Sequence, residues 1–147
     1  MVSTITAIVS AYYADKYIDE RLENLTNQTP KPEVIVVAEQ NSYEAEAARV
    51  HDCILIQTNG IPTIYKAWNT AWQASYTKYI VNANSDDLFL DGGLAKMAQA
   101  LDEHPDHCLV YGNLMREEPN GERRIWDRRP GLMSEIPYRC FVGPMPM

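Results

Sequence analysis

Two adjacent carboxylates, Asp86 and Asp87, are the side chains of this sequence best suited to do chemistry. They close the run Asn-Ala-Asn-Ser-Asp-Asp at residues 82–87, which follows directly on the apolar residues 79–81. Two like charges at the mouth of a buried strand repel each other and lose hydration, so a positive partner usually compensates them. Mg²⁺ and Mn²⁺ prefer oxygen ligands of this kind. The pair therefore indicates a divalent-metal site or, alternatively, a solvated turn that caps a helix beginning near residue 91.

The elements that must position these carboxylates follow from an alternating apolar pattern. Short apolar runs predict strands at residues 5–9, 34–37, 53–56, 79–81 and 108–111. Helices are predicted between them: one capped by Asp15, one over residues 44–50, one opened by Pro62 and one after residue 91. Strands and helices that alternate in this way predict an α/β fold, a Rossmann-like, mainly parallel sheet flanked by helices.

Polar side chains leave the carboxyl ends of these strands, where ligands bind in an open parallel sheet. The candidate nucleotide-binding residues at this edge are Ala11, Tyr12, Tyr13, Glu39 and Asn59. Tyr12 can stack on a base and Glu39 can accept a hydrogen bond from a base or ribose, while the aspartate pair holds a metal on a diphosphate. The alternative is that loops simply collect polar residues.

The helix opened by Pro62 carries two stripes. The stripe expected to face the sheet is Ile61, Ile64, Trp68, Ala71 or Trp72, and Ser75. A second, polar stripe contains Lys66, Asn69 and Gln73. It is either a solvated face or, because the helix begins at the ligand edge, a position from which Lys66 reaches a phosphate.

Length and composition limit the other possibilities. The 147 residues are 46% hydrophobic and 22% charged, as expected of one globular domain, and the net charge of −7 argues against a nucleic-acid-binding surface. No apolar run is long enough to span a bilayer, and no secretory signal is visible.

Cys53 and Cys108 lie in apolar runs and, with Cys140, make an odd number, which predicts buried free thiols in a reducing, cytoplasmic compartment. His104 and His107, separated by Pro105 and Asp106, favour a surface turn over a metal site.

The regular pattern ends near Gly112, so we expect a core over residues 1–112 and a hairpin with an irregular tail over residues 113–147. A polar turn at residues 117–122 separates Leu114 from Ile125. The tail is rich in apolar residues with no clear period, which predicts that it docks on the domain or packs against a second copy in a homodimer, the dimer being slightly favoured.

In its order of motifs the chain resembles the nucleotide-sugar-binding half of a family 2 glycosyltransferase with the GT-A nucleotide-diphospho-sugar transferase fold. Ile-Val-Ser-Ala-Tyr-Tyr at residues 8–13 resembles the family's opening strand, and Leu-Thr-Asn-Gln-Thr at 25–29 its Leu-x-x-Gln-Thr helix end. Ile-Tyr-Lys-Ala-Trp-Asn at 64–69 resembles Ile-Tyr-Asp-Ala-x-Asn, and residues 82–87 resemble the Asp-x-Asp-Asp metal motif. Further similarities lie at residues 36–42, at the His-Pro stretch within 101–111, and at the Gly-Pro-x-Pro segment of 143–147.

The resemblance implies an inverting, Mn²⁺- or Mg²⁺-dependent transfer of a sugar from a nucleotide-diphospho-sugar donor to a saccharide or lipid-linked acceptor of unknown identity. It also implies donor contacts at Asn59, Lys66, Asn69 and Asn84, beside those proposed for Tyr12, Glu39 and Asp86. Asn84 replaces the first aspartate of the metal motif, which leaves Asp86 and Asp87 as metal ligands.

Other departures from the family pattern keep two alternatives in view. Ala38-Glu39 replaces an aspartate pair, so only Glu39 can take the base-contacting acidic role, and Lys66 replaces an acid. The family usually continues beyond the segment that ends at Met147 into an acceptor side, and no residue here is assigned as the catalytic base. The chain could therefore be a truncated, non-catalytic nucleotide-sugar-binding or assembly module. A nucleotidyltransferase is disfavoured because residues 10–14 contain no glycine to cradle phosphates.

Overall fold

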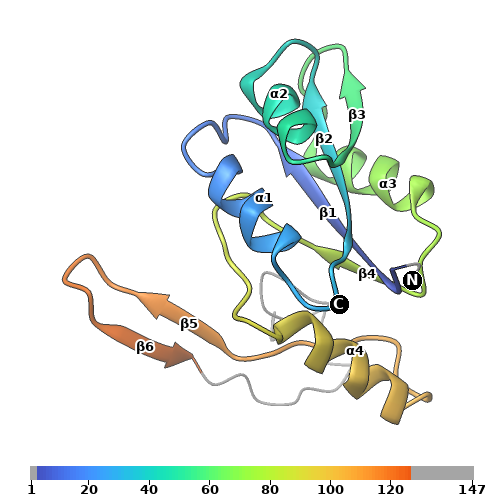
Figure 1. The fold of residues 1–147 in the computed structure, drawn as a ribbon, viewed down its shortest axis with the longest axis vertical. Helices are drawn as coiled ribbons and strands as arrows, with labels where there is room; N and C mark the ends of the chain where they lie inside the picture. The colour runs from blue at the N-terminus through green and yellow to red at the C-terminus, as the bar shows by residue number, and fades with distance from the viewer. Residues whose placement is uncertain (1–2, 127–147) are drawn as a thin grey trace.

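A four-stranded parallel sheet forms the centre of the protein in the computed structural model, which describes residues 3–126. Its strands are β1 (Ile5–Ala11), β2 (Glu33–Glu39), β3 (Ile54–Thr58) and β4 (Tyr79–Asn82), in the order β3-β2-β1-β4 (Figure 1). The two central strands, β1 and β2, are apolar on both faces, as expected of strands covered from both sides. The predicted α/β, Rossmann-like fold is confirmed.

Helices cover both faces of this sheet. Alternate residues of β1 and β2 pack against α1 (Ile18–Thr26), α2 (Tyr43–Val50) and α4 (Gly93–Glu103) in one core cluster. The intervening residues Ile8, Ile35 and Val37 face α3 (Ile64–Ala74) in a second cluster. The strand period of two therefore divides the apolar side chains between two layers.

The face that α3 buries differs from the predicted stripe. Ala67 and Ala71 are each 1% exposed, whereas Ile64 and Trp72 are 47% and 61% exposed. Small side chains let the helix backbone lie close to the sheet, and only Trp68 of the larger residues packs against this cluster. The prediction is confirmed for Trp68 and Ala71 and wrong for Ile61 and Ile64, because large apolar residues were assumed to face inward although much of any protein surface is apolar.

The residues at which α1 and α4 begin show that two further predictions are wrong. Asp15 does not cap α1: Tyr17 occupies the cap position without a side-chain bond, and a backbone turn from Tyr17 N to Ala14 O (2.8 Å) leads into the helix. Helix α4 begins after Gly92, whose φ of 71° is left-handed and readily adopted by glycine. No side chain caps α4, so the interpretation of Asp86 and Asp87 as its cap is wrong.

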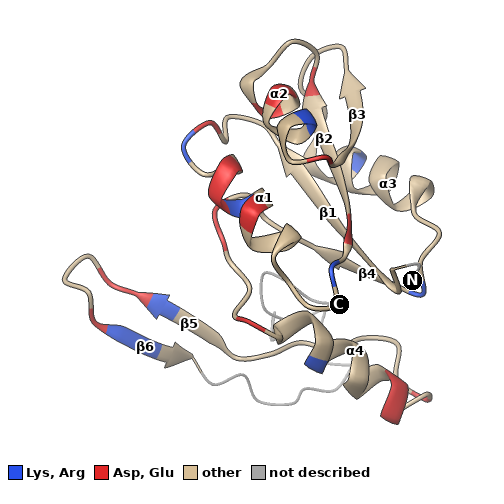
Figure 2. Cartoon of the chain, viewed as in Figure 1, with Lys and Arg blue, Asp and Glu red and all other residues tan. Residues whose placement is uncertain are grey.

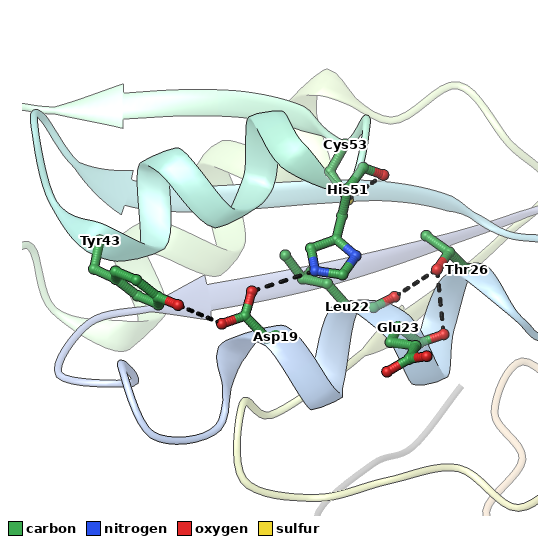
Figure 3. Close-up of polar contacts among 7 residues, drawn as sticks. All are labelled: Asp19, Leu22, Glu23, Thr26, Tyr43, His51 and Cys53. Carbon is green, nitrogen blue, oxygen red and sulfur yellow. Dashed lines mark hydrogen bonds and ion pairs between the residues drawn. The ribbon is translucent and has the colours of Figure 1, made fainter.

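A polar bridge joins α1 to α2. Tyr43 donates its phenolic hydrogen to Asp19 Oδ2 (2.6 Å), and His51 Nε2 lies 3.3 Å from Asp19 Oδ1 (Figure 3). The Thr26 hydroxyl contacts the Leu22 carbonyl oxygen (2.9 Å) at the other end of α1. These contacts add polar restraints to the apolar packing that holds α1 on the sheet.

The predicted hairpin is present and the predicted fifth parallel strand is not. Strands β5 (Leu114–Glu117) and β6 (Arg123–Trp126) pair antiparallel, and Gly121 N donates to Glu118 O (2.8 Å) in their turn. Residues 108–111 are outside any strand, because an apolar run of four residues does not by itself specify strand pairing and only Val110 of them packs against the core.

The hairpin lies beside α4 and extends away from the sheet (Figure 1). Both strands carry basic side chains, and acidic residues lie at the end of β5 and in the turn, as Figure 2 shows. Glu117 pairs with Arg123 (3.0 Å), Arg116 with Glu118 (3.3 Å) and Arg124 with Glu122 (3.2 Å).

The cysteines differ in exposure. Cys53 is half-buried, whereas Cys108 is exposed, so its predicted burial is wrong for the same reason that the fifth strand is absent. Cys140 and the tail whose docking was predicted lie outside the described residues. Within residues 3–126, none of the helices combines the length and apolar content of a membrane span.

We predict that Ala67→Leu destabilises the protein by about 1–3 kcal/mol because the added methylenes overpack the contact between α3 and the sheet. Truncation of the exposed Ile64 to alanine should change the free energy of unfolding by less than about 0.5 kcal/mol. Urea denaturation of the two variants measures both. A larger loss for Ile64→Ala than for Ala67→Leu would restore the apolar stripe predicted from the sequence.

We also predict that Cys53 reacts slowly with iodoacetamide in the native state. Burial raises the pKa of its thiol from 9.0 to about 11. Only the thiolate reacts, so two units of pKa slow alkylation by about a hundredfold relative to the urea-unfolded chain. Mass spectrometry of tryptic peptides at pH 8 gives the rate for each cysteine, and the exposed Cys108 provides the internal control. Equal rates for Cys53 in native and unfolded protein would contradict its burial.

Candidate functional site

An open pocket of about 310 Å³ lies at the carboxyl ends of β1 and β2. Its lining comprises Ala11, Tyr12, Tyr13, Asp15, Glu39, Ser42, Glu44 and Ile61. Four of the predicted donor-binding residues, Ala11, Tyr12, Tyr13 and Glu39, therefore meet in one cavity. A second pocket, of about 340 Å³, is lined by Ser3, Lys31 and Glu33 among others, toward the amino ends of β2 and β3 and away from the predicted residues.

Hydrogen bonds hold the walls of this pocket in place. The Tyr12 hydroxyl lies 2.9 Å from Thr58 Oγ1, which ties the loop after β1 to the end of β3. Ala14 N donates to the buried carboxylate of Glu44 (2.7 Å), and the Ser42 hydroxyl accepts from Ala45 N (3.2 Å) at the start of α2. Side chains on three separate elements are thereby fixed around a common space.

The pocket is acidic and contains an aromatic ring. Burial raises the pKa of the Tyr12 phenol, the hydrogen bond to Thr58 opposes this rise, and the charge of Glu39 adds to it. Tyr12 therefore remains a neutral hydroxyl at physiological pH. Carboxylates accept hydrogen bonds and do not donate them when ionised, so the pocket suits a ligand with N–H or O–H donors, such as a nucleobase edge or a ribose.

The aspartate pair lies in the loop that follows β4, next to β1 in the sheet. Ala83 N donates to Ile8 O (2.9 Å), so this pairing continues one residue beyond β4. Asn84 Nδ2 donates to Asp87 Oδ2 (3.2 Å), Asp87 is half-buried and Asp86 is exposed. The loop thus presents one free-standing carboxylate and one that is held by a neighbouring amide.

A buried cation, which the sequence analysis missed, faces this loop. Arg21 on α1 is 0% exposed, and its guanidinium carbon lies 4.6 Å from the centroid of the Phe89 ring. Burial lowers the pKa of Arg21 to about 10, and the negative charges of Asp87 and Asp86 oppose that shift. The positive partner that two adjacent carboxylates require is therefore supplied in part by the protein. A sequence signal existed: Arg21 adjoins Leu22 on the face that also carries Ile18 and Leu25.

Helix α1 also fixes the backbone of the loop. The Asn24 side chain donates to Phe89 O (2.8 Å) and accepts from Phe89 N (2.9 Å), and Gln28 Nε2 donates to the same carbonyl oxygen (3.5 Å). Arg21 Nη1 donates to Asn24 Oδ1 (3.1 Å). The loop that carries Asp86 and Asp87 is consequently clamped two residues after Asp87 by amide side chains of α1.

The remaining predicted donor residues are exposed and do not line the pocket. Asn59 follows β3, and Lys66 and Asn69 lie on α3. Lys66 N donates to the Thr63 hydroxyl (3.3 Å), so Lys66 belongs to the first turn of a helix that begins at the carboxyl edge. A role for these three residues in donor binding stays a prediction.

The oxygen atoms of Asp86, Asp87 and Asn84 fit a hard divalent cation. Among residues 3–126, these carboxylates do not belong to a cluster of three or more His, Cys, Asp or Glu ligands. Mg²⁺ is commonly held by one or two carboxylates, with waters and substrate phosphates completing its shell. The donor set present here has that character.

A parallel sheet with a polar pocket and an acidic loop at its carboxyl edge defines the class of Rossmann-like nucleotide-binding folds. The chain matches the family model of glycosyl transferase family 2 over residues 6–141, and it belongs to that family. The predicted family and its GT-A fold are confirmed.

Solved structures agree in fold. The mannosyltransferase PcManGT from Pyrobaculum calidifontis, in complex with GDP-Man and Mn²⁺, superposes with a TM-score of 0.69 at 23% identity, over 80% of this chain and 37% of that one. TarS of S. aureus gives 0.58 at 26% identity, over 69% and 20% of the two chains. A CMP-2-keto-3-deoxy-manno-octonic acid synthetase complexed with CTP gives 0.60 at 12% identity, over 78% and 54%. No curated protein sequence matches the chain.

The chain spans little more than a third of the mannosyltransferase and a fifth of TarS. The similarity to the synthetase, at 12% identity, is one of fold alone.

We predict that Asn24→Ala lowers the free energy of unfolding by about 1–3 kcal/mol, because Phe89 N loses its acceptor and Phe89 O keeps only the longer bond from Gln28. Asn27→Ala is the matched control, since Asn27 is exposed at the end of the same helix. Thermal and urea denaturation measure the difference. Equal effects of the two substitutions would show that the clamp on the loop does not contribute to stability.

Proposed function

We propose that this chain forms the donor side of a metal-dependent, inverting glycosyltransferase and binds a nucleotide-diphospho-sugar across the carboxyl edge of its sheet. The observation that carries the proposal is the convergence of Ala11, Tyr12, Tyr13 and Glu39 in one pocket. The loop of Asp86 and Asp87 follows β4, which is the neighbour of β1 in the sheet. Membership of glycosyl transferase family 2 gives this edge its chemistry.

In this proposal the residues divide the donor between them. Tyr12 contacts the face of the base, Glu39 accepts a hydrogen bond from the base or ribose, and Ala11 and Tyr13 shape the wall of the pocket. Asp86 and Asp87, assisted by Asn84, hold Mn²⁺ or Mg²⁺. The cation, when bound, neutralises the charge that develops on the departing diphosphate. Asn59, Lys66 and Asn69 line the route of the phosphates and sugar from α3 and the loop before it.

Charge explains why a metal is needed here. Acidic side chains gather on α1, α2 and the end of β2, around the carboxyl edge (Figure 2), and the whole chain carries a net charge of −7. An anionic diphosphate would be repelled from such an edge unless a divalent cation came with it. Arg21 is buried and interacts with the aspartate loop from the inner side, so it does not replace that cation.

We assign no residue to the acceptor side of the reaction. Glu117 and Glu118 follow the core, but Arg123 and Arg116 engage their carboxylates (3.0 Å and 3.3 Å), so neither is assigned as the base that deprotonates a saccharide or lipid-linked acceptor. The second candidate function is a nucleotide-sugar-binding or assembly module without transfer activity, and the engagement of both glutamates by arginines favours it. A homodimer and a cytoplasmic location remain predictions, the former supported by Ile125 and Trp126, which are 73% and 58% exposed.

We predict that a nucleoside diphosphate raises the melting temperature only when Mn²⁺ or Mg²⁺ is present. Ligand at a hundredfold excess over Kd adds about 2.7 kcal/mol, or about 5–10 °C for a domain of this size. UDP, GDP, CDP, ADP and dTDP are compared with and without metal in a thermal-shift assay. If none of them shifts the melting temperature at millimolar concentration with metal present, the donor-site proposal fails.

Asp86→Asn provides the matched test of the metal ligands. It should remove the metal-dependent shift while leaving the unliganded melting temperature near that of the wild type, because Asp86 is exposed and Asp87 contributes more than Asp86 to the charge interaction with Arg21. Asp91→Asn, exposed five residues further along, is the control and should retain the shift. Hydrolysis of a sugar nucleotide by the wild type, lost in Asp86→Asn, would separate an enzyme from a binding module.

A further inference from the structure

The turn that ends α4 brings together two of the three histidines of the chain. His104 terminates the helix with its N–H on Ala100 O (3.1 Å), and His107 N donates to His104 O (2.9 Å). Pro105 lies inside the turn and restricts its backbone. The backbone thus fixes the two imidazoles on one short segment, and the packed core is not required to gather them.

The side chains of this turn converge as well. His104, Asp106 and His107 each offer one ligand atom, and all three atoms lie within 4.8 Å of one another. The two rings are 5.4 Å apart between centroids, at 66°, and Asp106 Oδ1 lies 3.0 Å from His107 Nδ1. The carboxylate therefore lies close to both rings.

These spacings are close to those of a metal site. At the tetrahedral angle of a zinc site, ligand bonds of about 2.0–2.2 Å place two donor atoms about 3.3–3.6 Å apart. Small rotations of exposed side chains bring atoms that already lie within 4.8 Å into that range. The neighbouring Asp102 is engaged elsewhere, by Lys78 and by the Tyr79 hydroxyl, so the ligand set is limited to the turn.

We propose that His104, Asp106 and His107 form a surface site for a borderline transition-metal cation, Zn²⁺ being the expected occupant. Two imidazoles and one carboxylate suit Zn²⁺, Cu²⁺ or Ni²⁺, whereas Mg²⁺ prefers an all-oxygen shell. Water completes the coordination, because all three residues are exposed.

This site is separate from the proposed donor site. Figure 1 shows the arrowheads of β1, β2 and β3 pointing away from α4, which lies at the opposite end of the molecule beside the hairpin. The bound cation would fix the direction in which the chain leaves α4, since residues 108–113 have no regular secondary structure before β5 begins at Leu114. The site stabilises a connection, and the proposed function does not depend on it.

The test is a titration of tag-free protein with Zn²⁺, followed by isothermal calorimetry, and with Cu²⁺, followed by electron paramagnetic resonance. We expect one Zn²⁺ per chain and two nitrogen ligands on Cu²⁺. His107→Gln should weaken Zn²⁺ binding by at least about tenfold, as loss of a ligand does. His51→Gln is the control, because His51 follows α2, lies beside Asp19 and is outside the cluster.

Two further variants define the ligand set. Asp106→Asn should also weaken binding, while Cys108→Ser should leave it unchanged, because Cys108 is exposed but is not part of the cluster. The proposal is overturned if Zn²⁺ does not bind at up to millimolar concentration, if His107→Gln binds as tightly as the wild type, or if Cys108→Ser abolishes binding. Metal-dependent nucleotide binding measured in His107→Gln reports on the donor site alone, so failure of one proposal is distinguishable from failure of the other.

Discussion

The carboxyl edge of the sheet depends on one interaction, that between the buried guanidinium of Arg21 and the loop that carries Asp86 and Asp87. A cation with 0% exposure is tolerated only where opposite charge and hydrogen bonds compensate its lost hydration, and here Asp86, Asp87 and Asn24 provide them. Because Arg21 lies on α1, the packing of that helix against the sheet determines where the acidic loop sits.

The contacts that hold α1 in place therefore also determine the geometry of the proposed donor site, although they lie away from it. Ile18, Leu22 and Leu25 anchor the helix in the core, and the Asp19 bridge to Tyr43 and His51 ties it to α2. Helix α2 in turn provides Glu44, whose carboxylate holds the Ala14 backbone beside the pocket. The positions of the pocket and of the acidic loop thus both depend on one packed pair of helices. Residues far from any ligand can shift both together.

The sequence predicts the core elements well because the spacing of their apolar residues shows which faces are buried. Strands β1 and β2 are apolar on both faces, and α1 repeats Ile18, Leu22 and Leu25 at helical spacing. It fails where two patterns compete: on α3 the small Ala67 is buried, whereas Ile64 of the predicted stripe is exposed. The pocket residues could be predicted because parallel strands end at one edge. Arg21 could not be assigned a role, because the acidic and aromatic residues that it faces, Asp86, Asp87 and Phe89, are 65 residues or more away in the chain.

The hairpin is stabilised by different interactions from those of the sheet. Its two strands have no apolar layer of their own, and both faces are largely exposed. Ion pairs such as Glu117–Arg123 and Arg124–Glu122 link its side chains across and along the strands. Exposed ion pairs weaken as the Debye length falls from about 10 Å at 0.1 M salt to about 3 Å at 1 M, whereas apolar burial does not. The protein therefore combines a sheet whose order is insensitive to ionic strength with an arm whose order depends on it.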